Sequence, residues 1–142
     1  RPELTELVAR TLGQLGAERA WVVHGADGLD EISTTGYTKV SESIDGAVRT
    51  FYLHPADVGV PRATVADLAG GTATENAALL EQLLAGERGP RRDIVALNAG
   101  ASLLIAGRAA TLGEGMNLAV AAIDDGRAAA TLAALRRSCG KR

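Results

Sequence analysis

One stretch of this sequence reads Ala20-Trp21-Val22-Val23-His24-Gly25-Ala26-Asp27-Gly28-Leu29-Asp30-Glu31, a short apolar run followed by a loop of glycines and acidic residues. Residues 20–23 are too few for a helix and rich in β-forming side chains, so they predict a buried strand. The loop starts where this strand ends, at the edge where open α/β sheets bind their ligands. A strand that leads into such a loop predicts an α/β fold with a functional site at the loop.

The segments on either side supply the helices and the remaining strands. Upstream, apolar residues recur at helical spacing through residues 3–15, and Gly16 ends this helix. Downstream, Asp45-Gly46 is a two-residue hairpin signal between antiparallel strands predicted at 38–43 and 48–53. Four more helices are predicted, the first with a capping box of Thr72 and Glu75, over residues 74–85, 90–106, 111–124 and 127–137.

The composition indicates one soluble globular unit. The chain has 142 residues, 46% of them hydrophobic and 23% charged, and no run approaches the roughly 18 apolar residues that span a membrane. Its 15 basic and 17 acidic residues give a net charge of −2, so sequence-independent nucleic-acid binding is not expected. Cys139 is the single cysteine, which excludes an internal disulfide and fits the reducing cytoplasm.

Asp30 and Glu31 are the candidate metal ligands. In a turn, two adjacent carboxylates of different length can reach one point, as an oxygen-only site for a hard cation requires. Mg²⁺ is typically held by one or two carboxylates together with substrate phosphates, so the pair suits a metal-bridged pyrophosphate. The alternative is an ordinary turn or capping role for these two residues and for Asp27, since Asp and Gly are the commonest turn residues.

Other polar residues are interpreted structurally. His24, at the strand end, is a hydrogen-bonding residue or a base, and the structural role is favoured. A calcium loop beginning at Asp27 is excluded, because no bidentate Glu follows at the required spacing. Asn98, polar within an apolar helix that is buried on more than one face, must find a partner and is expected to tie that helix to a neighbouring loop.

Residues near the helix starts receive structural interpretations as well. Gly70-Gly71 permits a tight turn and is not a phosphate cradle, since no Lys-Ser/Thr follows. Glu75 and Asn76 lie in a first helical turn, where capping accounts for them. Arg91 and Arg92 are expected to be solvated surface residues.

Four blocks, in order, resemble the anthranilate phosphoribosyltransferase family. The first, residues 24–33, closely resembles its signature His-Gly-x-Asp-Gly-x-Asp-Glu. The order of the blocks over essentially the whole chain makes the resemblance more specific than any one of them. The other three are Leu68-Ala-Gly70-Gly71 with Glu75-Asn76-Ala77, Gly89-Pro90-x-Arg92-Asp93 with Leu97-Asn98-Ala99, and Glu114-Gly115 with Gly126-x-Ala128.

The resemblance implies a transferase that moves phosphoribose from phosphoribosyl pyrophosphate to the amine of anthranilate, in tryptophan biosynthesis. It implies that Asp30 and Glu31 bind Mg²⁺ associated with the pyrophosphate. It also implies an α/β fold, part of a mixed-sheet domain like those of phosphoribosyltransferases and nucleoside phosphorylases, with helices packed around it. We carry no catalytic or cofactor-binding residue over from the family.

Several family segments are missing from this sequence. They are the Gly-Thr-Gly-Gly-Asp loop around the ribose phosphate and pyrophosphate, the Lys-His-Gly-Asn segment and the Arg that meets anthranilate. We therefore expect residues 1–142 to be the C-terminal part of the α/β domain. The first part of that domain, and the N-terminal helical domain through which such enzymes form homodimers, would precede it. The chain alone is expected to be inactive.

Two alternatives stay open. One is a non-catalytic relative that binds nucleic acid or a partner protein, which the net charge and the intact acidic pair disfavour. The other is a pyrimidine-nucleoside phosphorylase, which shares the architecture and should not need a metal held by Asp30 and Glu31.

Overall fold

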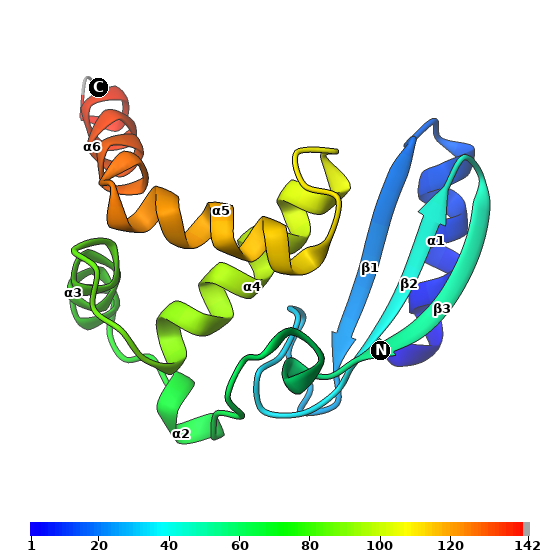
Figure 1. Ribbon diagram of the computed structural model, residues 1–142, viewed down its shortest axis with the longest axis horizontal. Helices are drawn as coiled ribbons and strands as arrows, with labels where there is room; N and C mark the ends of the chain where they lie inside the picture. The colour runs from blue at the N-terminus through cyan, green and yellow to red at the C-terminus, as the bar shows by residue number, and fades with distance from the viewer. Residues whose placement is uncertain (141–142) are drawn as a thin grey trace.

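The computed structural model describes residues 1–140 and contains a three-stranded antiparallel sheet with helices on both faces (Figure 1). The strands are β1 (Arg19–Gly25), β2 (Thr38–Ile44) and β3 (Ala47–Leu53), in the order β1-β2-β3. Asp45 and Gly46 both adopt positive φ angles, 49° and 81°, as a two-residue hairpin of the type I′ class requires. The predicted hairpin is therefore confirmed.

All the predicted helices are present, with boundaries shifted by a few residues. Thr72 and Glu75 form the predicted capping box, in which Glu75 Oε2 accepts a hydrogen bond of 2.7 Å from the Thr72 amide. The helices are α1 (Thr5–Gln14), α3 (Ala73–Leu84), α4 (Pro90–Ile105), α5 (Leu112–Asp124) and α6 (Arg127–Cys139). Three short elements were not expected from the sequence, namely α2 (Val65–Leu68) and the 3₁₀ helices η1 (Pro2–Leu4) and η2 (Pro55–Val58). None of the described helices is long and apolar enough to cross a membrane.

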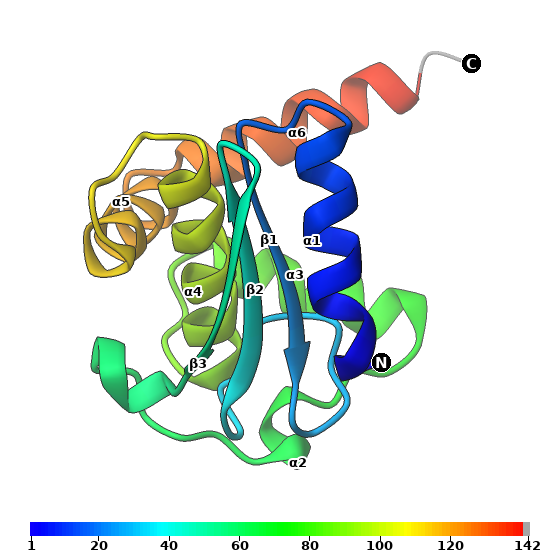
Figure 2. The same cartoon turned by 90° about the vertical axis from the view of Figure 1, so that its right-hand side faces the viewer.

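Helix α1 covers one face of the sheet through small residues (Figure 2). Thr5 and Ala9, its two buried residues, lie on the sheet side, and the Thr5 hydroxyl accepts a hydrogen bond of 2.9 Å from Ser41 of β2. A Cβ added at Gly13 would lie 2.6 Å from the hydroxyl of Ser43. Small polar residues on the sheet therefore allow a close approach of the helix.

The large apolar residues of α1 point away from the sheet. Leu7 is 59% exposed and Leu15, which follows the helix, is 78% exposed. The apolar periodicity that predicted this helix thus marks a surface that no other described element covers.

The opposite face of the sheet holds the main core and packs on α4. Its buried residues are Ile32, Val40, Leu53, Leu97 and Ala101. Trp21 and Phe51 pack against this cluster and against each other edge to face, with ring centroids 5.5 Å apart. Helix α4 also packs along α5, so the prediction that it is buried on more than one face is confirmed.

Strand β1 differs from the buried strand that the sequence predicts. Within the described residues it pairs only with β2, so it is an edge strand. Ala20 and Gly25 are buried, while the five residues Arg19, Trp21, Val22, Val23 and His24 are half-buried. Helix α1 and the α4 core cover its two faces, and the strand is only half-buried because its outer edge has no neighbouring strand within the described residues.

Candidate functional site

The acidic loop joins β1 to β2 and closes on itself through the backbone. The Gly25 amide donates to the Leu29 carbonyl at 2.9 Å, and the Ala26 amide donates to the Tyr37 carbonyl at 3.0 Å. The loop lies at the lower end of the sheet in Figure 1, beside α4. The sequence therefore placed this loop correctly, at the carboxyl end of a strand.

Asp27 organises this loop. Its carboxylate accepts hydrogen bonds from the Ser33 hydroxyl at 2.6 Å, the Thr35 hydroxyl at 2.5 Å and the Leu29 amide at 3.1 Å. Burial by itself raises the pKa of Asp27, but the hydrogen bonds from Ser33, Thr35 and the backbone outweigh burial and lower the pKa below its usual value. Of the two roles left open by the sequence, Asp27 has the structural one.

Asp30 and Glu31 differ from Asp27 in their surroundings. Both are exposed, and neither takes part in the hydrogen bonds that hold the loop together. The structure thus gives this pair no turn-stabilising role, and their carboxylates are available to an outside partner.

The donor set around this pair fits a partly hydrated hard cation. Residues 1–140 contain no group of three or more His, Cys, Asp or Glu side chains that could hold a metal. Two adjacent exposed carboxylates supply oxygen ligands for Mg²⁺ and leave most of its positions to water or to phosphate oxygens. The exposed pair therefore suits a cation that is shared with phosphate oxygens, as the sequence predicts, and not a cation whose ligands all come from the protein.

Asn98 of α4 holds the loop immediately after Glu31. Its Oδ1 accepts from the Ile32 amide at 2.9 Å, and its Nδ2 donates to the Ile32 carbonyl at 2.9 Å. Nδ2 also donates to the Ile94 carbonyl of its own helix at 3.0 Å. The prediction that Asn98 ties its helix to a neighbouring loop is confirmed.

Glu31 lines a cavity of about 290 Å³ that gathers residues from three of the sequence blocks. Gly70 and Asn76 of the second block and Arg91 beside the third lie around the same cavity. Its remaining lining is mostly aliphatic and comprises Leu29, Leu68, Leu79, Leu80, Leu83, Ile94 and Val95. The fold therefore brings together motifs that are about sixty residues apart.

The polar residues around that cavity are held by the backbone, which agrees with the expected capping role of Asn76 but not with the expectation that Arg91 is solvated, since Arg91 is half-buried. Asn76 Oδ1 accepts from the Gly71 amide at 2.8 Å, and Arg91 donates to the Ala69 carbonyl at 2.8 Å. Asn76 therefore stabilises the turn before α3, and Arg91 fixes the end of α2.

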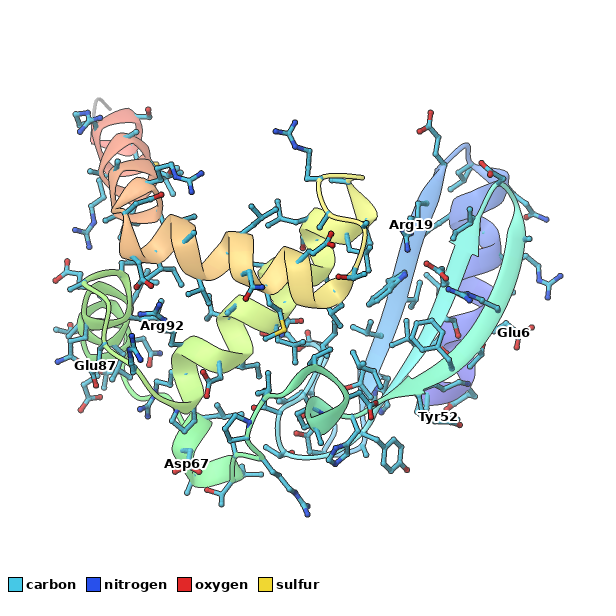
Figure 3. All side chains as sticks on the ribbon, in the orientation of Figure 1. Glu6, Arg19, Tyr52, Asp67, Glu87 and Arg92 are labelled. Carbon is cyan, nitrogen blue, oxygen red and sulfur yellow. The ribbon has the colours of Figure 1, made fainter. Side chains whose placement is uncertain are left out.

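Arg92 is not the solvated residue that the sequence predicts. It is 7% exposed, and its guanidinium donates to the Gly86 carbonyl at 3.0 Å and to Asp124 at 2.6 Å. Figure 3 shows Arg92 directed inward, between α3 and the pair formed by α4 and α5. A basic residue at a helix start is typical of the surface, and only the later position of Asp124 on α5 makes this one buried.

His24 has no part in the acidic loop. It lies opposite Lys39 in the β1–β2 register, on the sheet face that α1 covers. This position disfavours a role for His24 as a base at the acidic loop.

Sequence reasoning missed Ser33 and Thr35, the two hydroxyls that hold Asp27. Both are buried and follow Asp27 by six and eight residues. The signal that identifies them is a Ser and a Thr two residues apart in a loop, where the Thr35 amide donates to the Ser33 hydroxyl at 3.0 Å and this local turn brings the two hydroxyls together.

A larger groove lies elsewhere in the described part of the chain. It has a volume of about 810 Å³ and runs between α4, α5 and α6, lined mainly by apolar residues such as Val95, Leu103 and Leu118. Its described lining contains no acidic side chain. We therefore place the candidate site at the acidic loop.

Known proteins resemble this chain in sequence and structure. Anthranilate phosphoribosyltransferase from Moorella thermoacetica is 55% identical over 134 residues, which are 94% of this chain and 40% of that enzyme. The crystal structure of the enzyme from Thermus thermophilus is 42% identical, with a TM-score of 0.80, and covers 89% of this chain and 37% of its own. The Saccharomyces cerevisiae enzyme in complex with PRPP and Mg is 25% identical, with a TM-score of 0.77, and covers 92% and 37%.

These relatives are much longer than the present chain, which spans about 40% of their length. The expected α/β fold with helices packed around a sheet is confirmed by the similarity, and the sheet within residues 1–140 is small and antiparallel. Residues 1–129 match the family described as "Glycosyl transferase family, a/b domain". The chain therefore belongs to the glycosyl transferase family, through its α/β domain.

Proposed function

We propose that this chain is the C-terminal part of an anthranilate phosphoribosyltransferase. The complete enzyme transfers phosphoribose from phosphoribosyl pyrophosphate to anthranilate and releases pyrophosphate, in tryptophan biosynthesis. The relative that is 55% identical carries this activity in its name. The observation that carries the proposal is the exposed Asp30–Glu31 pair in a loop that other residues already hold in place.

Asp30 and Glu31 would hold Mg²⁺ next to the pyrophosphate. Glu31 lines the cavity and Asp30 is the residue before it, and the hydrogen bonds of Asp27 and Asn98 fix the backbone that carries both. When bound, the cation offsets the negative charge of the leaving pyrophosphate. A related enzyme has been solved with both PRPP and Mg, which supports this assignment.

The chain's contribution to the reaction is positioning and electrostatics. The proposed reaction assigns no nucleophilic role to a side chain of this loop. Positive charge would develop at the ribose carbon as the pyrophosphate departs. Carboxylates fixed in advance would hold the cation beside that leaving group with little rearrangement during the reaction, which would lower the barrier.

The rest of the enzyme would supply the substrate cradle. The Gly-Thr-Gly-Gly-Asp and Lys-His-Gly-Asn segments are not in this sequence, so the 142 residues alone would lack transferase activity. We place the complete protein in the cytoplasm as a homodimer that pairs through an N-terminal helical domain.

The test is phosphoribosyl transfer to anthranilate by the complete protein with Asp30→Ala and Glu31→Ala combined. We expect the rate to fall by roughly 100-fold or more, because the ligands of the cation are lost. The control is Glu18→Ala, which removes an exposed carboxylate at the opposite end of β1 from the loop.

Full activity of the Asp30/Glu31 variant across a Mg²⁺ titration would reject the metal assignment. Metal-independent phosphorolysis of pyrimidine nucleosides by the unaltered protein would show the phosphorylase alternative instead. A salt-dependent shift of DNA with no transfer would show a nucleic-acid-binding relative.

A further inference from the structure

The backbone of Ile32, the residue after Glu31, is hydrogen-bonded to Asn98 of helix α4. Asn98 uses both ends of its side-chain amide on one residue, accepting from the Ile32 amide and donating to the Ile32 carbonyl, each at 2.9 Å. Ile32 is itself 2% exposed and belongs to the core. The backbone on the carboxyl side of Glu31 is therefore fixed both by hydrogen bonds and by packing.

This contact suits an amide side chain. The backbone of Ile32 presents one donor and one acceptor on neighbouring peptide groups, and the Asn98 amide carries an acceptor and a donor on separate atoms that reach both. The third contact, from Nδ2 to the Ile94 carbonyl at 3.0 Å, assigns the amide its orientation, because an oxygen there would face another oxygen.

Asp27 holds the loop both before and after the acidic pair. Its carboxylate joins the Leu29 amide, before the acidic pair, to the Ser33 hydroxyl, after the pair. Asp30 and Glu31 thus lie between two anchor points and contribute nothing to either. The loop is built so that its two free carboxylates are presented by a backbone fixed on both sides.

We propose that Asn98 is a positioning residue for the cation site of Asp30 and Glu31. It touches neither the cation nor the substrate in this arrangement, and acts by keeping the Glu31–Ile32 backbone in the geometry that lets both carboxylates meet one ion. The inference rests on the function proposed above, since it requires that this pair binds a divalent cation.

The test is Mn²⁺ binding to the complete protein, followed by electron paramagnetic resonance in the presence of pyrophosphate. Asn98→Leu keeps the size of the side chain and removes all three hydrogen bonds. We expect its Mn²⁺ dissociation constant to rise roughly 10- to 100-fold, the usual effect of losing a residue that orients a metal ligand. Asn98→Ser, which keeps a polar side chain but is too short to reach both groups of Ile32, should raise the constant in the same direction.

A purely structural role is separated by a matched variant on the same helix. Leu104→Ala destabilises α4 about 9 Å further along its axis, away from the loop. Each protein is measured the same number of degrees below its own melting temperature. Under these conditions Leu104→Ala should bind Mn²⁺ with the same dissociation constant as the unaltered protein. Hydrogen exchange at the Ile32 amide should accelerate in Asn98→Leu and not in Leu104→Ala.

The outcomes distinguish this inference from the proposed function. Unaltered protein that binds Mn²⁺, with equal binding by both Asn98 variants, would overturn the positioning role alone. Equal weakening by Leu104→Ala would also overturn it, since general destabilisation would then explain the effect. Unaltered protein that binds no Mn²⁺, or binds it equally after Asp30→Ala with Glu31→Ala, would overturn the proposed metal site and this inference with it.

Discussion

Glu42 in the middle of β2 is a fully buried carboxylate with partners from both neighbouring strands. Its Oε1 accepts from the Trp21 indole at 2.7 Å and from Arg19 at 2.8 and 3.1 Å, and its Oε2 accepts from Arg49 at 2.5 Å. Arg19 also donates to the Leu104 carbonyl at 3.1 Å, and Figure 3 shows it reaching from β1 toward α4. This network joins the sheet to the end of the helix that carries Asn98.

This network stabilises the ionised form of the Glu42 carboxyl. Burial by itself raises the pKa of Glu42, but hydrogen bonds from Trp21, Arg19 and Arg49 prevail and lower the pKa below its usual value of 4.5. A carboxyl with a lowered pKa in the folded state adds stability that is present above pH 4.5. That stability is lost as the pH falls through the folded-state value.

Replacing Glu42 with Gln should therefore destabilise the protein in a pH-dependent way. At pH 7 we expect a loss of about 2 kcal/mol, because Arg19 and Arg49 lose a charged acceptor. The loss should shrink as the pH falls below 4.5, where Glu42 takes up a proton in the unfolded state first, and it should disappear once the pH is below the folded-state pKa. Urea denaturation at pH 7 and at acidic pH measures both values, and a difference that is constant with pH would contradict this account.

Helices α4 and α5 cross at two glycines. A Cβ on Gly100 would lie 2.6 Å from the backbone nitrogen of Met116 and 2.9 Å from its Cα, and Gly115 faces the backbone of Gly100 in the same way. A backbone at such a distance cannot move aside without shifting the whole helix. The close crossing brings α5 against α4 and completes the core beside the sheet.

Gly100→Ala should destabilise the protein by about 1–3 kcal/mol, the usual effect of overpacking a tight contact. Gly113→Ala is the matched control, since it lies in the first turn of α5 with no atom within 4 Å of its added Cβ. The control should leave stability unchanged or raise it by about 0.5–1 kcal/mol, because alanine favours helix more than glycine does. Thermal unfolding of the two variants decides the matter, and equal melting temperatures would show that the helices do not cross so closely.

The elements that sequence predicted well are those set by neighbouring residues. The Asp45-Gly46 hairpin, the Thr72/Glu75 capping box and the need of Asn98 for a partner each follow from local chemistry, and each is confirmed. The site loop was found for the same reason, because the strand and its acidic loop are contiguous. Asp27, by contrast, was ambiguous, since its partners are hydroxyls whose orientation the sequence does not give.

The failures have a common physical cause, which is contact between distant segments. Arg92 is buried because Asp124 of another helix pairs with it, and β1 lies at an edge because no further strand is supplied within residues 1–140. The apolar periodicity of α1 located the helix but not the side that faces the sheet. Periodicity shows that a face is apolar and does not show what covers it.

The described part of the chain exposes large apolar side chains in two places. Leu4, Leu7, Val8 and Leu15 are all exposed along α1, on the side away from the sheet. The groove between α4, α5 and α6 is apolar as well. Extended surfaces of this kind mark places where other protein normally packs.

The 142-residue chain should therefore bind the dye ANS in its folded state, and Leu7→Lys should reduce the fluorescence. Gln14→Lys adds the same charge to an exposed polar position of α1 and should not reduce it. Neither variant should change stability by more than about 0.5 kcal/mol, because both side chains are on the surface. Equal fluorescence of the two variants would show that this face of α1 is not an accessible apolar surface.

The most direct measurement is a crystal structure of the complete protein with Mg²⁺ and phosphoribosyl pyrophosphate. We expect a cation within about 2.0–2.1 Å of a carboxylate oxygen of Asp30 or Glu31 and in contact with the pyrophosphate. We also expect Asn98 to keep both hydrogen bonds to Ile32. A cation held only by other residues, with both carboxylates turned toward solvent, would contradict the central claim.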